Sequence, residues 1–137
     1  MNDESLTTLL RLRQAAVDEA RLALAACVRE EAAARAALAA LDASAEREAA
    51  AAARLEAPDR TVEEFAVWLR RIRIDREMRE QALTLAETRS REARSVLTVS
   101  MAAAGSLEKL VERRAAERRA QADARSQREL DEQGTRR

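Results

Sequence analysis

The chain has 137 residues, and its 25 Lys and Arg residues balance 25 Asp and Glu residues, so its formal net charge is zero. Aromatic residues make up 1% of it, and only two glycines and one proline interrupt it. This composition excludes a globule with a large aromatic core and a sheet with many turns, whereas its excess of Ala, Glu, Leu and Arg is typical of long helices or coiled coils. With no His and only Cys27, a His/Cys zinc site, a His-dependent triad and an intramolecular disulfide are excluded as well.

The first predicted element is a helix from about Ser5 to Glu56. Pro58 ends it, because proline lacks the backbone N–H and disfavours helix at the residue before it. After a turn at 57–61, the stretch Thr61–Glu64 has the pattern of a capping box, in which Thr61 and Glu64 satisfy each other's free N–H groups. A second helix is therefore predicted over about 62–133.

Both predicted helices carry apolar residues in alternating steps of four and three, which is the spacing of a coiled-coil seam. From Leu6 to Leu55, twelve of fifteen such positions are apolar, and from Val62 to Val111, eleven of fifteen are. Folding the chain back at Pro58 brings the far ends of both seams to the same height. The sequence therefore predicts an all-α fold, in which two long helices form a single antiparallel coiled-coil hairpin and residues 112–137 overhang as an unpaired C-terminal helix.

No catalytic constellation is visible, because the carboxylates lie among arginines at helical spacing, as solvated helix faces do. Apolar residues also occur off the seam at the start of the second helix. Trp68 is the most notable of them, because a two-helix rod has no interior wide enough to bury it, and an exposed aromatic residue is a candidate partner anchor. The other members of this set are Val67, Ile74, Met78 and Leu85.

The charge pattern bears on the class of partner. Residues 113–137 mix eight arginines with five acids, which favours a mixed-charge helix over a nucleic-acid-binding one. Zero net charge gives no reason to expect DNA or an anionic membrane as partner. No signal peptide and no stretch of about 18 apolar residues is present, so we expect a cytoplasmic protein. We expect no metal and no cofactor, because the sequence has no His and no catalytic constellation.

Several stretches resemble the family of the flagellar type III export protein FliJ and its stalk-like relatives in virulence secretion. The opening Ser5–Arg13, SLTTLLRLR, is similar to the family's Leu-rich, Arg-punctuated start. The segment Phe65–Ile72, FAVWLRRI, is similar to the aromatic–aliphatic start of its second helix. The end, Leu107–Arg114 (LEKLVERR) followed by Glu129–Glu132 (ELDE), is the most specific part of a resemblance that covers nearly the whole chain.

The resemblance implies a non-enzymatic coiled-coil hairpin, similar to the γ-subunit stalk of rotary ATPases. It implies that the end bearing both termini binds the hexameric export ATPase FliI, and that the start of the second helix contacts the export gate protein FlhA. A chaperone role, with export chaperones as further partners, is also implied, and the protein would be peripheral to the inner membrane, on its cytoplasmic face, through its partners only. The residues implied for the gate are Phe65, Trp68, Leu69 and Ile72, and those implied for the ATPase are Arg11, Arg13, Arg113, Arg114, Arg118 and Arg119.

A second interpretation of the same seams remains open. The two helices can pair between chains rather than within one chain, which would make the protein an intermolecular coiled-coil scaffold or dimerisation protein with no export role. The mass in solution distinguishes the two, because a hairpin has the 15.2 kDa mass of one chain and a scaffold has about twice that mass or more.

Overall fold

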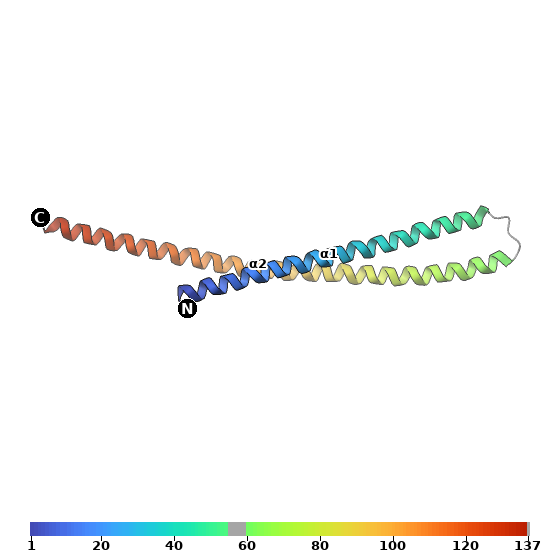
Figure 1. Cartoon of the computed structure of the whole chain (residues 1–137), viewed down its shortest axis with the longest axis horizontal. Helices are drawn as coiled ribbons and strands as arrows, with labels where there is room; N and C mark the ends of the chain where they lie inside the picture. Colours follow the sequence, from blue (N-terminus) through green and yellow to red (C-terminus); the bar gives the residue numbers. More distant parts are fainter. Residues whose placement is uncertain (55–59, 137) are drawn as a thin grey trace. The chain divides into compact units, whose positions relative to one another are not determined.

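The structure, a computed structural model, describes residues 1–54 and 60–136, without the side chains of Arg60 and Thr61. It consists of two helices, α1 (Asp3–Arg54) and α2 (Arg60–Thr135), each drawn without interruption in Figure 1. The described ranges contain no strand. The all-α prediction with two long helices is confirmed.

The helix ends differ from the predicted ones by about two residues. Helix α1 begins at Asp3 rather than Ser5, because Asn2 is its N-cap: the Asn2 side-chain oxygen accepts a hydrogen bond from the Ser5 N–H at 2.8 Å. Helix α2 begins at Arg60, so the end of the expected 57–61 turn is already helical, and it continues to Thr135 rather than to 133. Pro58 and the Thr61 hydroxyl of the expected capping box lie outside what the structure describes.

The chain divides into two compact units. The terminal unit combines Met1–Ala20 with Leu97–Arg137, and the central unit is Arg21–Val96. Each unit therefore holds one stretch of α1 and one stretch of α2.

In the central unit the two stretches run antiparallel, since contacts further along α1 meet residues that come earlier in α2. Three ion pairs and one hydrogen bond show this order. Glu30 lies 4.0 Å from Arg89, Arg35 lies 3.5 Å from Glu87, Arg79 donates to the Ala37 carbonyl at 2.7 Å, and Asp42 lies 2.9 Å from Arg76. Leu41, Ala86 and Ser90 are buried between the helices at predicted seam positions.

The terminal unit is antiparallel as well. Near the start of α1, Asp3 lies 2.7 Å from Arg118, and one helical stretch later Gln14 donates to Glu108 at 3.4 Å. The buried residues are again seam residues: Leu6, Val17, Ala20 and Ala104. Alanine buries little apolar area, so much of this core is thin and contributes little stability per turn.

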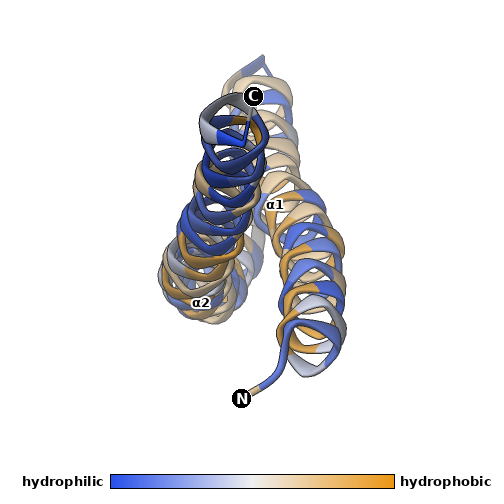
Figure 2. Ribbon diagram, turned by 90° about the vertical axis from the view of Figure 1, so that its left-hand side faces the viewer, coloured by the Kyte–Doolittle hydropathy of each residue, from blue (hydrophilic) through white to orange (hydrophobic). Residues whose placement is uncertain are grey.

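The C-terminal end of α2 stays in contact with α1 for longer than the apolar pattern suggests. Arg114 and Arg118, both within the expected overhang at 112–137, reach the first residues of the chain because the arginine side chain is long. All residues from 116 to 136 are nevertheless exposed. Figure 2 shows that this end of α2 is mostly hydrophilic, and in the terminal unit α2 continues well past the N-terminus (Figure 1).

Candidate partner-binding surfaces

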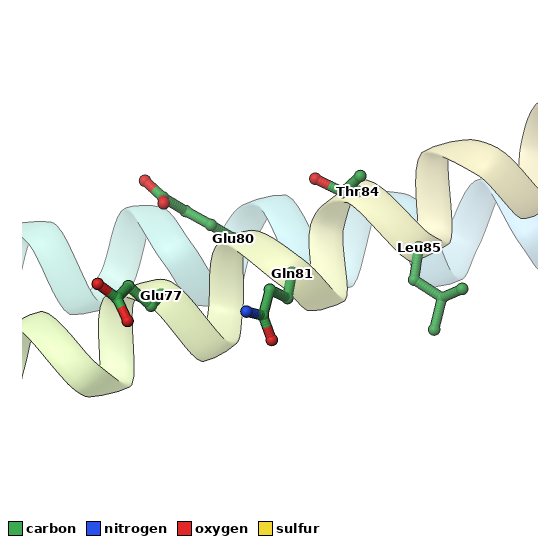
Figure 3. A pocket seen from close by; sticks show the side chains of 5 residues that line it. All are labelled: Glu77, Glu80, Gln81, Thr84 and Leu85. Carbon is green, nitrogen blue, oxygen red and sulfur yellow. The ribbon is translucent and has the colours of Figure 1, made fainter.

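Within the described ranges, no group of three or more His, Cys, Asp or Glu residues is placed to hold a metal ion. One depression is lined by Glu77, Glu80, Gln81, Thr84 and Leu85, all from α2. Figure 3 shows Glu80 and Thr84 on one side of the helix and Gln81 and Leu85 on the other, so these groups do not surround a common point.

The four residues expected to bind the gate fall into two pairs. Phe65 and Trp68 lie one turn apart with ring centroids 5.2 Å from each other and planes tilted by 34°, a contact within the range of favourable aromatic pairs. Phe65 is exposed and Trp68 is half-buried. Leu69 and Ile72 are half-buried at seam positions, so their role in packing competes with a role in binding.

Trp68 is the residue that borders both sides of this region. It lines one shallow depression with Val67 and Arg71 on the outer side of α2, and a second with Phe65 and Ala52 towards α1. A ring edge that is reachable from two sides, and backed by a second ring, is a suitable anchor for a partner.

Two of the six arginines expected to bind the ATPase are engaged within the terminal unit. Arg114 donates to the Met1 carbonyl at 2.7 Å and lies 3.8 Å from Asp3. Arg118 lies 2.7 Å from the same carboxylate. These partly exposed contacts are individually weak, on the order of 0–1 kcal/mol. They tie the start of α1 to α2, and a partner would have to compete with Asp3 for them.

The remaining four arginines, Arg11, Arg13, Arg113 and Arg119, are exposed, and none has an ion pair with another residue that the structure describes. They do not form one patch. Arg113 and Arg119 are about 120° apart around α2, and Arg11 and Arg13 are about 160° apart around α1. The structure thus presents isolated cations around both helices, rather than six arginines on one face.

A polar cluster in the seam of the central unit was not singled out from the sequence. Ser90 is 1% exposed, and the Glu31 carboxylate approaches it from α1. The Ser90 hydroxyl has no hydrogen bond of good geometry among the described residues, yet its approach is the main cause that lowers the pKa of Glu31, followed by a hydrogen bond from Arg35. The available signal was that Glu31 and Ser90 both interrupt the apolar pattern at facing seam positions.

Two arginines at seam positions of α2, Arg76 and Arg79, also have hydrogen-bond partners. Arg76 lies 2.9 Å from Asp42 and also pairs with Glu80, and the hydrogen bond and charge of Asp42 are the main causes that raise the pKa of Arg76. Arg79 donates to a carbonyl of α1. Both guanidinium groups reach from the seam to polar groups at its rim, so neither of the two is buried without a hydrogen-bond partner.

Comparison with known proteins identifies the family. A family model described as "Flagellar FliJ protein" matches residues 1–137, which is the whole chain. Neither a comparison with curated proteins nor one with solved structures found a match. No helix among the described residues is long and apolar enough to cross a membrane. The family match confirms the resemblance that the sequence motifs indicated.

Proposed function

Because this chain belongs to the FliJ family of flagellar proteins, which implies a role in flagellar protein export, we propose that it is a non-enzymatic stalk and chaperone component of the type III export apparatus. Its terminal unit binds the hexameric export ATPase, and its Phe65–Trp68 pair binds the export gate. It acts at the cytoplasmic face of the inner membrane, to which it is peripheral through these partners only.

The observation that carries the ATPase part of the proposal is the exposure of the last stretch of α2. Every residue from 116 to 136 is exposed, and arginines and acids are interspersed along this stretch. A helix that is exposed on all sides offers binding groups in every direction, which suits a site that surrounds it, as the channel of a ring does. The spread of Arg113 and Arg119 around α2 fits the same kind of site.

The test is the binding and stimulation of a FliI-type ATPase. We expect the chain to raise ATP turnover and the fraction of hexamer, and the Arg113→Glu, Arg119→Glu double variant to bind at least tenfold more weakly. Arg29→Glu with Arg47→Glu is the matched control, since both are exposed arginines of the central unit. If the unaltered chain changes neither ATP turnover nor the hexamer fraction, the proposal is refuted. If both double variants lose ATPase binding equally, the loss is a general effect of charge and Arg113 and Arg119 are not specific contacts.

The gate part is tested separately with Trp68→Ala. Truncation of a half-buried aromatic anchor is expected to weaken binding to an FlhA-type gate protein by at least tenfold, while ATPase binding stays unchanged. Val62→Ala, a more exposed apolar residue of the same helix, is the control. If Trp68→Ala loses both gate binding and ATPase binding, the fold has been lost, which circular dichroism detects. If gate binding stays intact, Trp68 is excluded as the anchor.

A further inference from the structure

Two arginines of the terminal unit lie where the apolar seam of α2 would continue. Val111 is the last apolar residue in the four-and-three spacing, and the next two positions of that spacing are Arg114 and Arg118. Because they are four residues apart, they are separated by only about 40° around the helix. Arg113 and Arg119 are each at least about 100° away from both of them. Arg114 and Arg118, which we call the arginine pair, therefore share the face that α2 turns towards α1.

The first residues of the chain occupy this arginine pair. The Asp3 carboxylate contacts both guanidinium groups, with Oδ2 2.7 Å from Arg118 Nη1 and Oδ1 3.8 Å from Arg114 Nη1. Arg114 Nη1 also donates a hydrogen bond to the Met1 carbonyl at 2.7 Å. We call the Asp3 carboxylate and the Met1 carbonyl together the N-terminal latch. The latch offers the arginine pair the same kind of oxygen acceptor that a carboxylate of another molecule would offer.

Local structure at the start of α1 holds the latch in place. The Asn2 side-chain oxygen accepts a hydrogen bond from the Ser5 N–H at 2.8 Å, and the Asn2 carbonyl accepts one from the Leu6 N–H at 3.1 Å. Leu6 is 3% exposed, so this first turn is packed against the seam. Met1 and Asp3 are therefore already ordered beside the arginine pair, where their effective concentration is high.

The latch is nevertheless open to competition. The side chains of Asp3, Arg114 and Arg118 are 45%, 38% and 59% exposed, and exposed ion pairs stabilise a fold only slightly. Opening the latch therefore requires little free energy and leaves the buried part of the seam intact. A group that occupies a site within its own chain lowers the apparent affinity for an outside ligand, because only the molecules in which the site is free can bind.

We propose that the N-terminal latch is an autoinhibitory contact, which withholds the arginine pair from the carboxylates of a partner until the latch opens. A partner that offers one carboxylate only replaces Asp3 and gains little. Arg125 and Arg128 are exposed and lie within about 40° of Arg114 around α2, so a partner with several acids gains contacts that the latch does not provide. The latch thereby selects partners with several acids. That this partner is the export ATPase rests on the proposed function, whereas the latch itself does not.

The first test measures the latch without a partner. Phenylglyoxal modifies accessible guanidinium groups, and mass spectrometry of the full chain gives a modification rate for each arginine. Asp3→Asn is expected to raise the rates of the arginine pair about two- to fivefold, the range that weak exposed ion pairs allow, with Arg113 and Arg119 unchanged. Glu4→Gln is the matched control, because Glu4 is also an acid in the first turn of α1 and has no ion pair with a residue that the structure describes.

The second test measures binding, with a fluorescently labelled hexaglutamate peptide at low salt and with a FliI-type ATPase. Asp3→Asn is expected to bind both about two- to fivefold more tightly than the unaltered chain, and Glu4→Gln to bind them equally well. When Arg114→Gln and Arg118→Gln are also present, Asp3→Asn should no longer increase the affinity, because the site for which Asp3 competes is gone. Circular dichroism checks that all variants keep the helical content of the unaltered chain.

Two outcomes would overturn the proposal. The first is that Asp3→Asn leaves the modification rates of the arginine pair unchanged, or that Glu4→Gln raises them equally, since charge loss at the start of α1 would then explain the result. The second is that the rates rise while binding of the peptide stays the same or weakens, because the contact would then only stabilise the start of α1. If the peptide binds as expected and the ATPase does not bind at all, the proposed function fails and the latch is supported.

Discussion

The two units use the same seam pattern with different chemistry. In the terminal unit the seam is mostly apolar, with Leu6, Val17 and Ala20 buried on α1. Its polar contacts are exposed and lie beside the seam or at its end. In the central unit, polar residues sit within the seam itself, with Ser90 buried and Glu31 beside it. Apolar layers contribute burial but tolerate sliding, whereas polar layers contribute little burial and select one alignment. The comparison indicates that the larger apolar residues of the terminal seam contribute more to stability, and that the polar residues of the central seam contribute more to register.

The largest expected effect is on the apolar seam. Leu6 is 3% exposed, and Leu6→Ala should lower the free energy of unfolding by about 2 kcal/mol, the low end of the range for buried leucines, because a two-helix seam can partly collapse onto the gap. Urea unfolding measures it. Leu12→Ala, at a 63% exposed position, should cost less than about 0.5 kcal/mol. Similar losses for the two variants would mean that the terminal seam does not supply the stability.

The next largest effect is a gain in stability, from a substitution in the terminal unit. Gly105 lies inside α2, and a Cβ added there would meet no atom within 4 Å. Helix α2 continues through this residue. Gly105→Ala should therefore raise the free energy of unfolding by up to about 1 kcal/mol, through helix propensity. A lower unfolding midpoint in thermal denaturation would show that the position needs glycine for a reason other than space.

A smaller effect is expected at the end of the apolar seam. Asp3→Asn removes the carboxylate shared by Arg114 and Arg118. It should lower the free energy of unfolding by about 0.5–1 kcal/mol at low salt. At high salt the loss should be small, because salt screens exposed ion pairs. Unfolding at two salt concentrations measures it. Asp123→Asn, at an exposed position later in α2, is the control. A cost that persists at high salt would point to the N-terminal capping region rather than to the ion pairs.

The smallest effect concerns the polar layer of the central unit. The folded pKa of Glu31 lies below its ordinary value because of Ser90 and Arg35. This stabilisation is fully present above the pKa that Glu31 has in the unfolded chain, and is lost as the pH falls through its lower folded pKa. Glu31→Gln should therefore destabilise slightly at neutral pH and flatten the acid side of the stability profile. An unchanged profile between pH 6 and pH 3 would exclude this contribution.

Much of the fold could be predicted because it depends on local patterns. Apolar residues at steps of four and three identify the face that each helix buries, and Leu6, Leu41, Ala86 and Ala104 are all buried at predicted seam positions. The predicted helix ends differ from the observed ones by about two residues. At the start of α1 the reason is the N-cap at Asn2, which depends on a side-chain conformation that the composition does not show. The contacts of Arg114 and Arg118 were missed for a similar reason, because the apolar pattern says nothing about how far a long side chain reaches.

The candidate sites divide in the same way. The sequence alone determined two long helices, their buried faces, the absence of aromatic residues other than Phe65 and Trp68, and the motifs by which the chain resembles its family. Only the tertiary structure decided which polar seam residues find partners and which arginines are held by Asp3. The physical reason is that helical periodicity is encoded within each segment, whereas pairing and exposure depend on the register between segments far apart in the chain.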